Sequence, residues 1–322
     1  MINYIYQLVA PGTFSVKFDD FQFADQVVVK PEYMAICHAD QRYYTGQRQR
    51  EIMESKLPMA LIHEACGTVL YDPSGTFNVG QQVVMIPNVP GGDNSVIMEN
   101  YARGASFLSS GRDGFMREYV SLPVDRLVPC DGIPDRIAAV TEFISVAAHS
   151  IRRFKGIAHS IRRRIGVWGD GSLAFVTANL LKMEFPESQI IVIGKNPTKL
   201  SYFTFADRTY LRETLTEPFE IDHAFECCGG DGSYYAIDDI IRYINPQGTV
   251  MLMGVSENKV AVNTRDILEK GITAVGSSRS GREDFVKAVK YLQDGRFRRR
   301  LELIIYEDAK VSSVEDIHRV FQ

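Results

Sequence analysis

Cysteine is scarce in this chain of 322 residues, with five copies at positions 37, 66, 130, 227 and 228. So few thiols at such irregular spacing do not form the disulfide framework that holds small secreted domains together. We therefore expect the thiols to be reduced. A reduced Cys37 remains available as a metal ligand.

An excess of basic residues is also absent, because 36 Lys and Arg stand against 40 Asp and Glu and the net charge is −4. This balance argues against a general nucleic-acid-binding protein. No apolar run approaches the ~18 residues that a membrane-spanning helix needs. The first residues lack a basic segment followed by an apolar one, so we expect no signal peptide and a cytoplasmic protein.

Short β-strands separated by turn residues are expected in the first part of the chain. Apolar runs at 26–30, 67–71 and 83–86 predict strands, the first of which should end at Pro31. The segments 72–75 and 87–95 have the composition of turns and loops. Strands of this length and spacing predict a small β-barrel domain over residues 1–140.

The sequence pattern changes after Pro134. Residues 137–153 carry apolar side chains at helical spacing, and apolar runs at 165–168, 189–193, 224–227, 249–253 and 272–275 then alternate with helical segments. This alternation predicts an α/β domain with a doubly wound parallel sheet, which we place at 141–279. Residues 280–322, with an expected helix from Arg282 and a strand at 301–306, should return to the first domain and complete it.

A set of metal-binding side chains is spread over residues 37–142: Cys37, His63, Glu64 and Glu142. A thiolate, an imidazole and carboxylates form a borderline-soft donor set that suits zinc. Asp40 is well placed to accept a hydrogen bond from the His63 ring and so to orient it. The alternative is that Cys37 and His63 are ordinary core residues, since a lone cysteine in a β-rich domain is usually a small buried hydrophobe.

A glycine-rich turn follows the expected strand at 165–168. Gly169, Gly171 and Ala174 form a G-x-G-x-x-A sequence, in which the first glycine permits the tight turn and the second lets backbone amides approach a pyrophosphate. The N-terminus of the following helix favours the same anion. We assign the dinucleotide site to Gly169, Asp170, Gly171, Ser172 and Leu173, with Gly254 and Ser277 after two later strands.

The end of the second strand of this domain distinguishes NAD from NADP. An NAD enzyme usually places Asp or Glu there to bind the ribose 2′-hydroxyl. This chain has Gly194, Lys195 and Asn196 instead, with Lys199 close behind. Because lysine attracts a 2′-phosphate, we expect NADPH, with Gly194, Lys195 and Lys199 in its site. The alternative is that both lysines are ordinary solvated surface.

Five motifs, in this order along the chain, resemble the zinc-dependent medium-chain dehydrogenases. They are Cys-His-Ala-Asp at 37–40, His-Glu-Ala-Cys-Gly at 63–67, Gly-Gln-Gln-Val-Val at 80–84, Gly-Phe-Met-Arg-Glu-Tyr-Val at 114–120 and Gly-Asp-Gly at 169–171. Within that superfamily, residues 33–37, 40–46, 168–171 and 276–281 resemble the ribulose-5-phosphate reductases of CDP-ribitol synthesis. Those enzymes supply ribitol units for teichoic acids or capsules.

The resemblance implies a GroES-like β-barrel catalytic domain and a Rossmann cofactor domain. It implies that Cys37, His63 and Glu142 bind zinc, with Glu64 as an exchangeable ligand or proton-handling group. The loop at 87–114 contains no cysteine, so the four-cysteine structural zinc of many relatives should be absent. We therefore expect one catalytic zinc ion.

The reaction that the resemblance implies is the NADPH-dependent reduction of D-ribulose 5-phosphate to D-ribitol 5-phosphate. A sugar phosphate needs cationic partners, and Arg42 is the first candidate, followed by Arg112 and Arg279. The resemblance also implies a homodimer, and an association with a ribitol-5-phosphate cytidylyltransferase is a further expectation.

Three other functions remain open on the sequence. An NAD(P)-linked polyol dehydrogenase for an unphosphorylated sugar alcohol would differ in cofactor preference and in its response to the substrate phosphate. A zinc-free enzyme resembling quinone reductases would share the fold, but Cys37 and Glu142 argue against it. A non-catalytic cofactor-binding protein would bind metal without turning over a carbonyl substrate.

Overall fold

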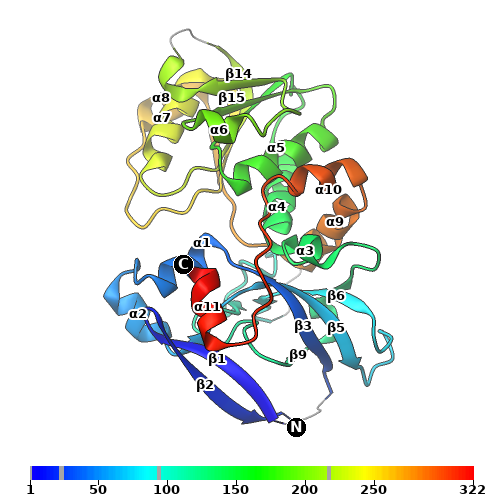
Figure 1. The fold of residues 1–322 in the computed structure, drawn as a ribbon. Helices are drawn as coiled ribbons and strands as arrows, with labels where there is room; N and C mark the ends of the chain where they lie inside the picture. Colours follow the sequence, from blue (N-terminus) through cyan, green and yellow to red (C-terminus); the bar gives the residue numbers. More distant parts are fainter. Residues whose placement is uncertain (1, 22–24, 93–95, 216–218) are drawn as a thin grey trace. The chain divides into compact units, whose positions relative to one another are not determined.

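The computed structural model describes residues 2–21, 25–92, 96–215 and 219–322 (Figure 1). The chain divides into two compact units, Met1–Ser145 with Ser280–Gln322, and Val146–Arg279. None of the helices in these described ranges is long and apolar enough to cross a membrane. Part of the loop expected at 87–95, residues 93–95, lies outside the described residues.

The first unit is built on β-sheets. One sheet, in the order β2-β1-β4, contains β1 (Ile2–Ala10), β2 (Thr13–Asp20) and β4 (Met59–Ala60). A second, in the order β10-β6-β5-β3-β9, contains β3 (Val27–Ala35), β5 (Glu64–Tyr71), β6 (Gln82–Met85), β9 (Val120–Leu122) and β10 (Leu127–Pro129). The short strand β7 (Asn88–Val89) pairs with β8 (Ser106–Phe107). Val27, Val29, Val69 and Val83 are fully buried in the core of the second sheet, as alternating apolar strands require.

Strand β3 does not end at Pro31, so that prediction is wrong. The strand continues to Ala35 and pairs with β5 through a shift of register between Pro31 and Tyr33. Pro31 lies opposite Gly67, where a Cβ atom would come within 2.2 Å of the Lys30 carbonyl oxygen. The bulge accommodates the proline, which cannot donate to the ladder, and the glycine permits the close approach.

Helices of the first unit are α1 (His38–Tyr44), α2 (Arg50–Lys56), α3 (Asp135–Ala138), α9 (Arg282–Leu292), α10 (Gly295–Leu301) and α11 (Val314–Phe321), with the 3₁₀ turn η1 (Val124–Arg126). Helix α4 (Thr141–Ile157) begins in the first unit and ends in the second. The strand predicted at 301–306 is wrong, because Leu301 is the last residue of α10 and residues 302–304 form a turn. Leu303 and Tyr306 are 51% and 86% exposed, so this segment lacks the burial that favours a strand.

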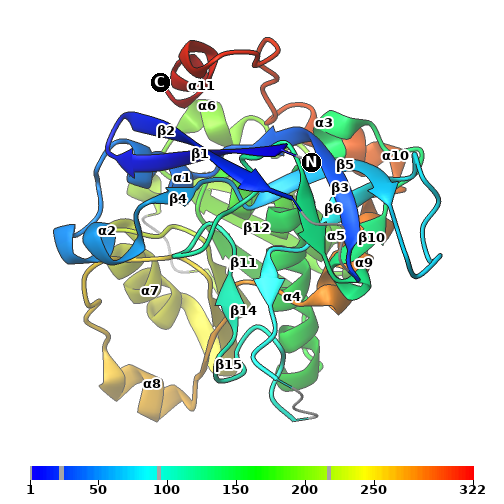
Figure 2. The same cartoon turned by 90° about the horizontal axis from the view of Figure 1, so that it is seen from below.

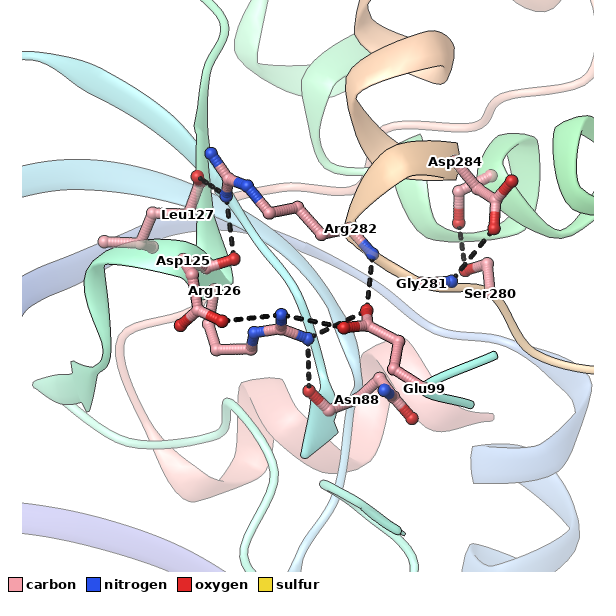
Figure 3. Close-up of polar contacts among 10 residues, drawn as sticks. Asn88, Glu99, Asp125, Arg126, Leu127, Ser280, Gly281, Arg282 and Asp284 are labelled. Atoms are coloured by element: carbon pink, nitrogen blue, oxygen red, sulfur yellow. Dashed lines mark hydrogen bonds and ion pairs between the residues drawn. The ribbon is translucent and has the colours of Figure 1, made fainter. Parts of the chain in front are cut away.

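Residues 280–284 join the rest of the first unit through a network of ion pairs and hydrogen bonds (Figure 3). The N–H of Arg282 donates to Glu99 Oε1 at 2.6 Å, and its guanidinium donates to the carbonyl oxygens of Asp125 and Leu127 at 2.7 Å each. Glu99 also accepts two hydrogen bonds of 3.0 Å from the buried Arg126. The start of α9 is thereby fixed beside β10.

Parallel strands form the sheet of the second unit, in the order β13-β12-β11-β14-β15-β16. They are β11 (Arg164–Trp168), β12 (Gln189–Gly194), β13 (Arg208–Leu211), β14 (Ile221–Glu226), β15 (Ile244–Leu252) and β16 (Thr273–Gly276). The connections include α5 (Ser172–Glu184), α6 (Pro197–Leu200), η2 (Arg212–Thr214), α7 (Gly232–Tyr243) and α8 (Thr264–Lys270). Figure 2 shows β12, β11, β14 and β15 side by side, with α5 over one face and α7 and α8 over the other.

The strand order 3-2-1-4-5-6 in this unit is that of a Rossmann sheet, so the doubly wound prediction is confirmed. Ligands of such sheets bind beyond the carboxyl ends of the strands, where the strand order reverses, which here is between β11 and β14. Strand β13 was not predicted from the sequence. Its first two residues, Arg208 and Thr209, are exposed, so it carries no apolar run.

A buried histidine gives the second unit an expected pH dependence. His223 is fully buried on β14, and its ring lies 4.3 Å from the ring of His159. Burial, together with a smaller effect of the neighbouring His159, lowers the pKa of His223 to about 4. The unfolded chain takes up this proton near pH 6.5, so stability is complete above that pH. It should be lost as the pH falls from 6.5 to 4, by up to about 3 kcal/mol.

Urea unfolding at pH 7 and at pH 4.5, for the wild type and for His223→Gln, tests this expectation. The variant should lose less stability than the wild type between the two pH values. Equal losses would show that His223 is not responsible.

Candidate metal and cofactor sites

Pairing of two strands brings the expected metal ligands together. Strands β3 and β5 are antiparallel neighbours with Ala35 opposite Glu64, so Cys37, just after β3, meets His63, just before β5. Cys37 Sγ lies 3.4 Å from His63 Nε2. Glu142 enters from the first turn of α4. The donor atoms of His63, Glu64 and Glu142 all lie within 4.8 Å of one another, as do those of Cys37, Asp40 and His63.

The acidic groups of this cluster are almost fully enclosed. Glu64 is 4% exposed, Glu142 7% and Asp40 0%. Burial raises the pKa of the Cys37 thiol, with contributions from Asp40 and Glu64. Burial also raises the pKa of Glu64 well above its usual range, and the Glu142 and Asp40 carboxylates raise it further. A buried set of like charges is stable in its anionic form only beside a cation.

The donor set fits a zinc ion. Zinc binds cysteine sulfur at about 2.3 Å and histidine nitrogen at about 2.0 Å, so two such ligands at a tetrahedral angle lie roughly 3.5 Å apart. The observed separation of Cys37 Sγ and His63 Nε2, 3.4 Å, agrees with this value. A divalent cation would also compensate the buried carboxylates of Glu64 and Glu142.

Asp40 organises this site through the backbone rather than through the imidazole ring. Its Oδ1 lies 3.8 Å from His63 Nδ1, which is too long for the expected hydrogen bond to the ring. The same oxygen accepts the N–H of Ile62 at 3.0 Å and the hydroxyl of Ser109 at 3.1 Å. Its Oδ2 accepts the N–H and the Sγ–H of Cys37 at 3.2 Å and 3.1 Å. Asp40 therefore fixes Cys37, and it also fixes Ile62, the residue before His63.

Ile62 has a backbone conformation that β-branched residues rarely adopt. Its φ angle is 68°, in the left-handed region, although the side chain is only 5% exposed and packs in the core of the first unit. Such a residue costs on the order of 1–3 kcal/mol unless its surroundings hold it there. The hydrogen bond from its N–H to Asp40 is one such contact, and it sets the direction in which His63 leaves the turn.

The three arginines expected near the substrate do not all belong to one unit. Arg42 is half-buried on α1, and Arg112 is exposed in the loop before Gly114, both in the first unit. Arg279 lies in the second unit with a φ angle of 56°. Arg42 is five residues beyond the candidate ligand Cys37, at the other end of a short helix.

The glycine turn of the second unit has the shape that a pyrophosphate site needs. Gly169 has a φ angle of 131°, and a Cβ atom there would lie 3.0 Å from the Cys227 carbonyl oxygen. Gly171 is the N-cap of α5, and a Cβ atom there would meet nothing within 4 Å. Ser172 is exposed and Leu173 half-buried at the start of the helix. The N-terminus of this helix, where Gly171 and Ser172 are exposed residues, suits a phosphate group.

The remaining expected cofactor residues lie at the carboxyl ends of other strands. Lys195 and Lys199 are exposed after β12, and Gly194 is the last residue of that strand. Ser277 follows β16, donates its N–H to the Leu252 carbonyl at 2.9 Å and is 5% exposed. Its burial makes the Ser277 side chain a less accessible cofactor contact than the two lysines.

Glu226 is a buried carboxylate beside the expected cofactor residue Gly254 that the sequence reasoning did not single out. It ends β14, is 1% exposed, and its Oε1 accepts hydrogen bonds from Cys228 N–H, Gly229 N–H and the Ser233 hydroxyl at 2.9, 3.2 and 3.1 Å. Its Oε2 accepts the N–H of Gly254 at 2.9 Å. This carboxylate ties the loop after β14 to the loop after β15. An acidic residue inside the apolar run expected at 224–227 was the available signal.

Comparisons with known proteins agree with this architecture. Residues 24–135 match the alcohol dehydrogenase GroES-like domain, and residues 204–294 match the zinc-binding dehydrogenase family. The GroES-like and Rossmann fold expected from the sequence is thus confirmed.

Individual relatives cover the whole chain. Ribulose-5-phosphate reductase of Streptococcus pneumoniae is 54% identical over 100% of this chain and 94% of its own length. The Bacillus spizizenii enzyme of the same name is 48% identical over 100% and 95%. The crystal structure of Staphylococcus aureus TarJ in complex with NADPH superposes with a TM-score of 0.88 at 43% identity, covering 100% of this chain and 95% of that one. The chain therefore belongs to the ribulose-5-phosphate reductase family of zinc-binding dehydrogenases.

Proposed function

We propose that this protein is an oxidoreductase that uses NADPH and zinc to reduce D-ribulose 5-phosphate to D-ribitol 5-phosphate, a precursor of CDP-ribitol for teichoic acid or capsule synthesis. The observation that carries the proposal is the enclosed cluster of Cys37, His63, Glu64 and Glu142. The names of the full-length relatives support the substrate, and the NADPH complex of a relative supports the cofactor.

In the proposed site Cys37, His63 and Glu142 would hold the zinc ion, which would supply Lewis-acid chemistry at the C2 ketone. Asp40 keeps Cys37 and the backbone before His63 in place. Glu64, enclosed beside the ligands, supplies the proton that the ketone oxygen needs to become a hydroxyl group. Arg42 is our candidate for binding the substrate phosphate.

NADPH would bind to the second unit and supply the hydride. Gly169, Asp170, Gly171, Ser172 and Leu173 form the turn and helix N-terminus that would face the pyrophosphate. Gly254 and Ser277 lie at the same edge of the sheet. Lys195 and Lys199 would attract the 2′-phosphate, because β12 ends in Gly194 rather than in an acidic residue.

The proposal assigns distinct roles to the parts of the chain. Residues 1–140, completed by 280–322, would form the catalytic domain and residues 141–279 the NADP-binding domain. We further propose that the enzyme is a cytoplasmic homodimer with one zinc ion per chain and without a structural zinc. Association with a ribitol-5-phosphate cytidylyltransferase would pass the product to the next reaction.

The decisive assay follows NADPH oxidation by absorbance with ribulose 5-phosphate as the substrate. The enzyme is assayed as purified, after its metal has been removed by chelation, and after zinc has been returned. NADH and unphosphorylated ribulose are run in parallel. We expect turnover that needs zinc and favours both NADPH and the phosphorylated sugar. Turnover that survives complete metal removal would contradict the zinc site, whereas preference for the unphosphorylated sugar would favour a polyol dehydrogenase instead.

A further inference from the structure

The Asp170 side chain reaches from the glycine turn to the loop after the neighbouring strand. Its Oδ2 accepts the N–H of Lys195 at 2.8 Å and the N–H of Asn196 at 2.7 Å. Strands β11 and β12 are parallel, with Trp168 opposite Ile193, so both loops leave the same edge of the sheet. One carboxylate therefore joins the turn expected to bind the pyrophosphate to the segment expected to bind the 2′-phosphate.

Gly194 leaves the space that this carboxylate fills. A Cβ atom at position 194 would lie 2.7 Å from Asp170 Cβ and 2.9 Å from Asp170 Oδ2, which is closer than non-bonded carbon and oxygen atoms approach. The absence of a side chain at Gly194, the last residue of β12, therefore makes room for the side chain of Asp170, the second residue of the glycine turn. An acidic side chain does reach the end of β12, but it comes from Asp170 and is bonded to the backbone.

The segment that Asp170 holds carries both lysines of the expected 2′-phosphate site. Asn196 is the N-cap of α6, and its side chain accepts the N–H of Lys199 at 3.1 Å. Hydrogen bonds therefore connect Asp170 to the backbone at 195 and 196, and from there to 199. A fixed backbone reduces the ordering cost when the Lys195 and Lys199 side chains bind an anion.

We infer that Asp170 is a positioning residue for cofactor selection, whose carboxylate fixes residues 195–199 so that Lys195 and Lys199 receive the 2′-phosphate of NADPH. The inference rests on the proposed use of NADPH. The negative charge of Asp170 is compatible with a nearby phosphate, because two N–H dipoles point at its Oδ2 and offset part of that charge.

Calorimetric binding of 2′,5′-ADP and of 5′-AMP to the full chain tests the inference without any turnover. Asp170→Ala should weaken 2′,5′-ADP binding about tenfold more than it weakens 5′-AMP binding, because only the first ligand carries the 2′-phosphate. Asp170→Asn retains an oxygen that can accept both N–H groups, so it should bind 2′,5′-ADP at least as tightly as the wild type. Gly194→Ala adds a methyl group that clashes with the Asp170 carboxylate and with Leu200 Cδ2, without changing any charge, and should reproduce the selective loss.

Two outcomes would overturn the inference about Asp170 and leave the proposed NADPH preference intact. Equal losses for both nucleotides in Asp170→Ala and Gly194→Ala would show that the carboxylate supports the adenosine site in general. Tighter 2′,5′-ADP binding by Asp170→Ala would show that its charge opposes the phosphate. If circular dichroism shows that Asp170→Ala does not fold, Asp170→Asn and Gly194→Ala decide the question. A wild type that binds 5′-AMP as tightly as 2′,5′-ADP would overturn the proposed NADPH preference together with the inference.

Discussion

Replacing Cys37 by serine is expected to remove bound zinc and to lower kcat by at least about a thousandfold. Cys37 Sγ lies 3.4 Å from His63 Nε2, so the substitution removes one of two adjacent donors. A serine hydroxyl is a poor zinc ligand beside the soft thiolate it replaces. A Lewis-acid metal contributes several kcal/mol to such a reaction, and about 1.4 kcal/mol is worth a factor of ten in rate. Metal content by mass spectrometry and kcat with NADPH are the two measurements.

Cys66→Ser is the matched control for this experiment. Cys66 is a buried cysteine on β5, two residues from Glu64, and its thiol donates to the Asp135 carbonyl oxygen at 3.3 Å, as a serine hydroxyl can. We expect it to retain both zinc and turnover. The zinc assignment fails if Cys37→Ser keeps its metal and its activity, or if both serine variants lose them equally.

Glu99→Ala is expected to lower the free energy of unfolding of the first unit by about 2–3 kcal/mol, because removing Glu99, which is 28% exposed, leaves the buried charge of Arg126 largely uncompensated. Arg126 is 4% exposed and donates two hydrogen bonds to Glu99 (Figure 3). The same carboxylate accepts the N–H of Arg282 and so fixes the start of α9. Asp125, which pairs with Arg126 at 2.8 Å, keeps the loss near the lower end of the range for buried pairs.

The control for this prediction is a surface ion pair of the same unit. Arg136 and Glu302 lie 2.8 Å apart, but their side chains are 45% and 43% exposed, so Glu302→Ala should cost less than about 1 kcal/mol. Urea unfolding measures both variants. Combining Glu99→Ala with Arg126→Met should recover part of the stability, since it removes the stranded charge. Equal small losses for the two alanine variants would contradict the prediction.

Much of the fold could be predicted because its strands follow local rules. The apolar runs at 165–168 and 189–193 became β11 and β12, since strands buried on both faces have continuous apolar sequences. Strand β13 lies at the sheet edge with half of its residues exposed, so no local pattern marked it. The segment 301–306 has an apolar sequence, but Leu301 completes α10 and the following residues are only half-buried or exposed.

The residues of the candidate metal site could be predicted from the sequence, whereas the hydrogen bonds that hold them in place could not. The types and order of Cys37, His63 and Glu142 were sufficient to suggest zinc. The hydrogen bonds of Asp170 to residues 195 and 196 span 25 and 26 positions, and those of Asp40 reach Ile62 and Ser109. Contacts of this kind depend on which strands become neighbours. Residue spacing does not contain that information.

The left-handed backbone at Ile62 couples thermal stability and metal binding at a single position. A residue more tolerant of this φ angle, such as asparagine or glycine, would relieve the strain but would also lose the buried side chain and loosen the turn into His63. Both losses act against the folded, zinc-binding state, because a buried isoleucine side chain contributes about 2–5 kcal/mol and bound zinc itself favours folding. Heat resistance and zinc retention should therefore fall together in such variants.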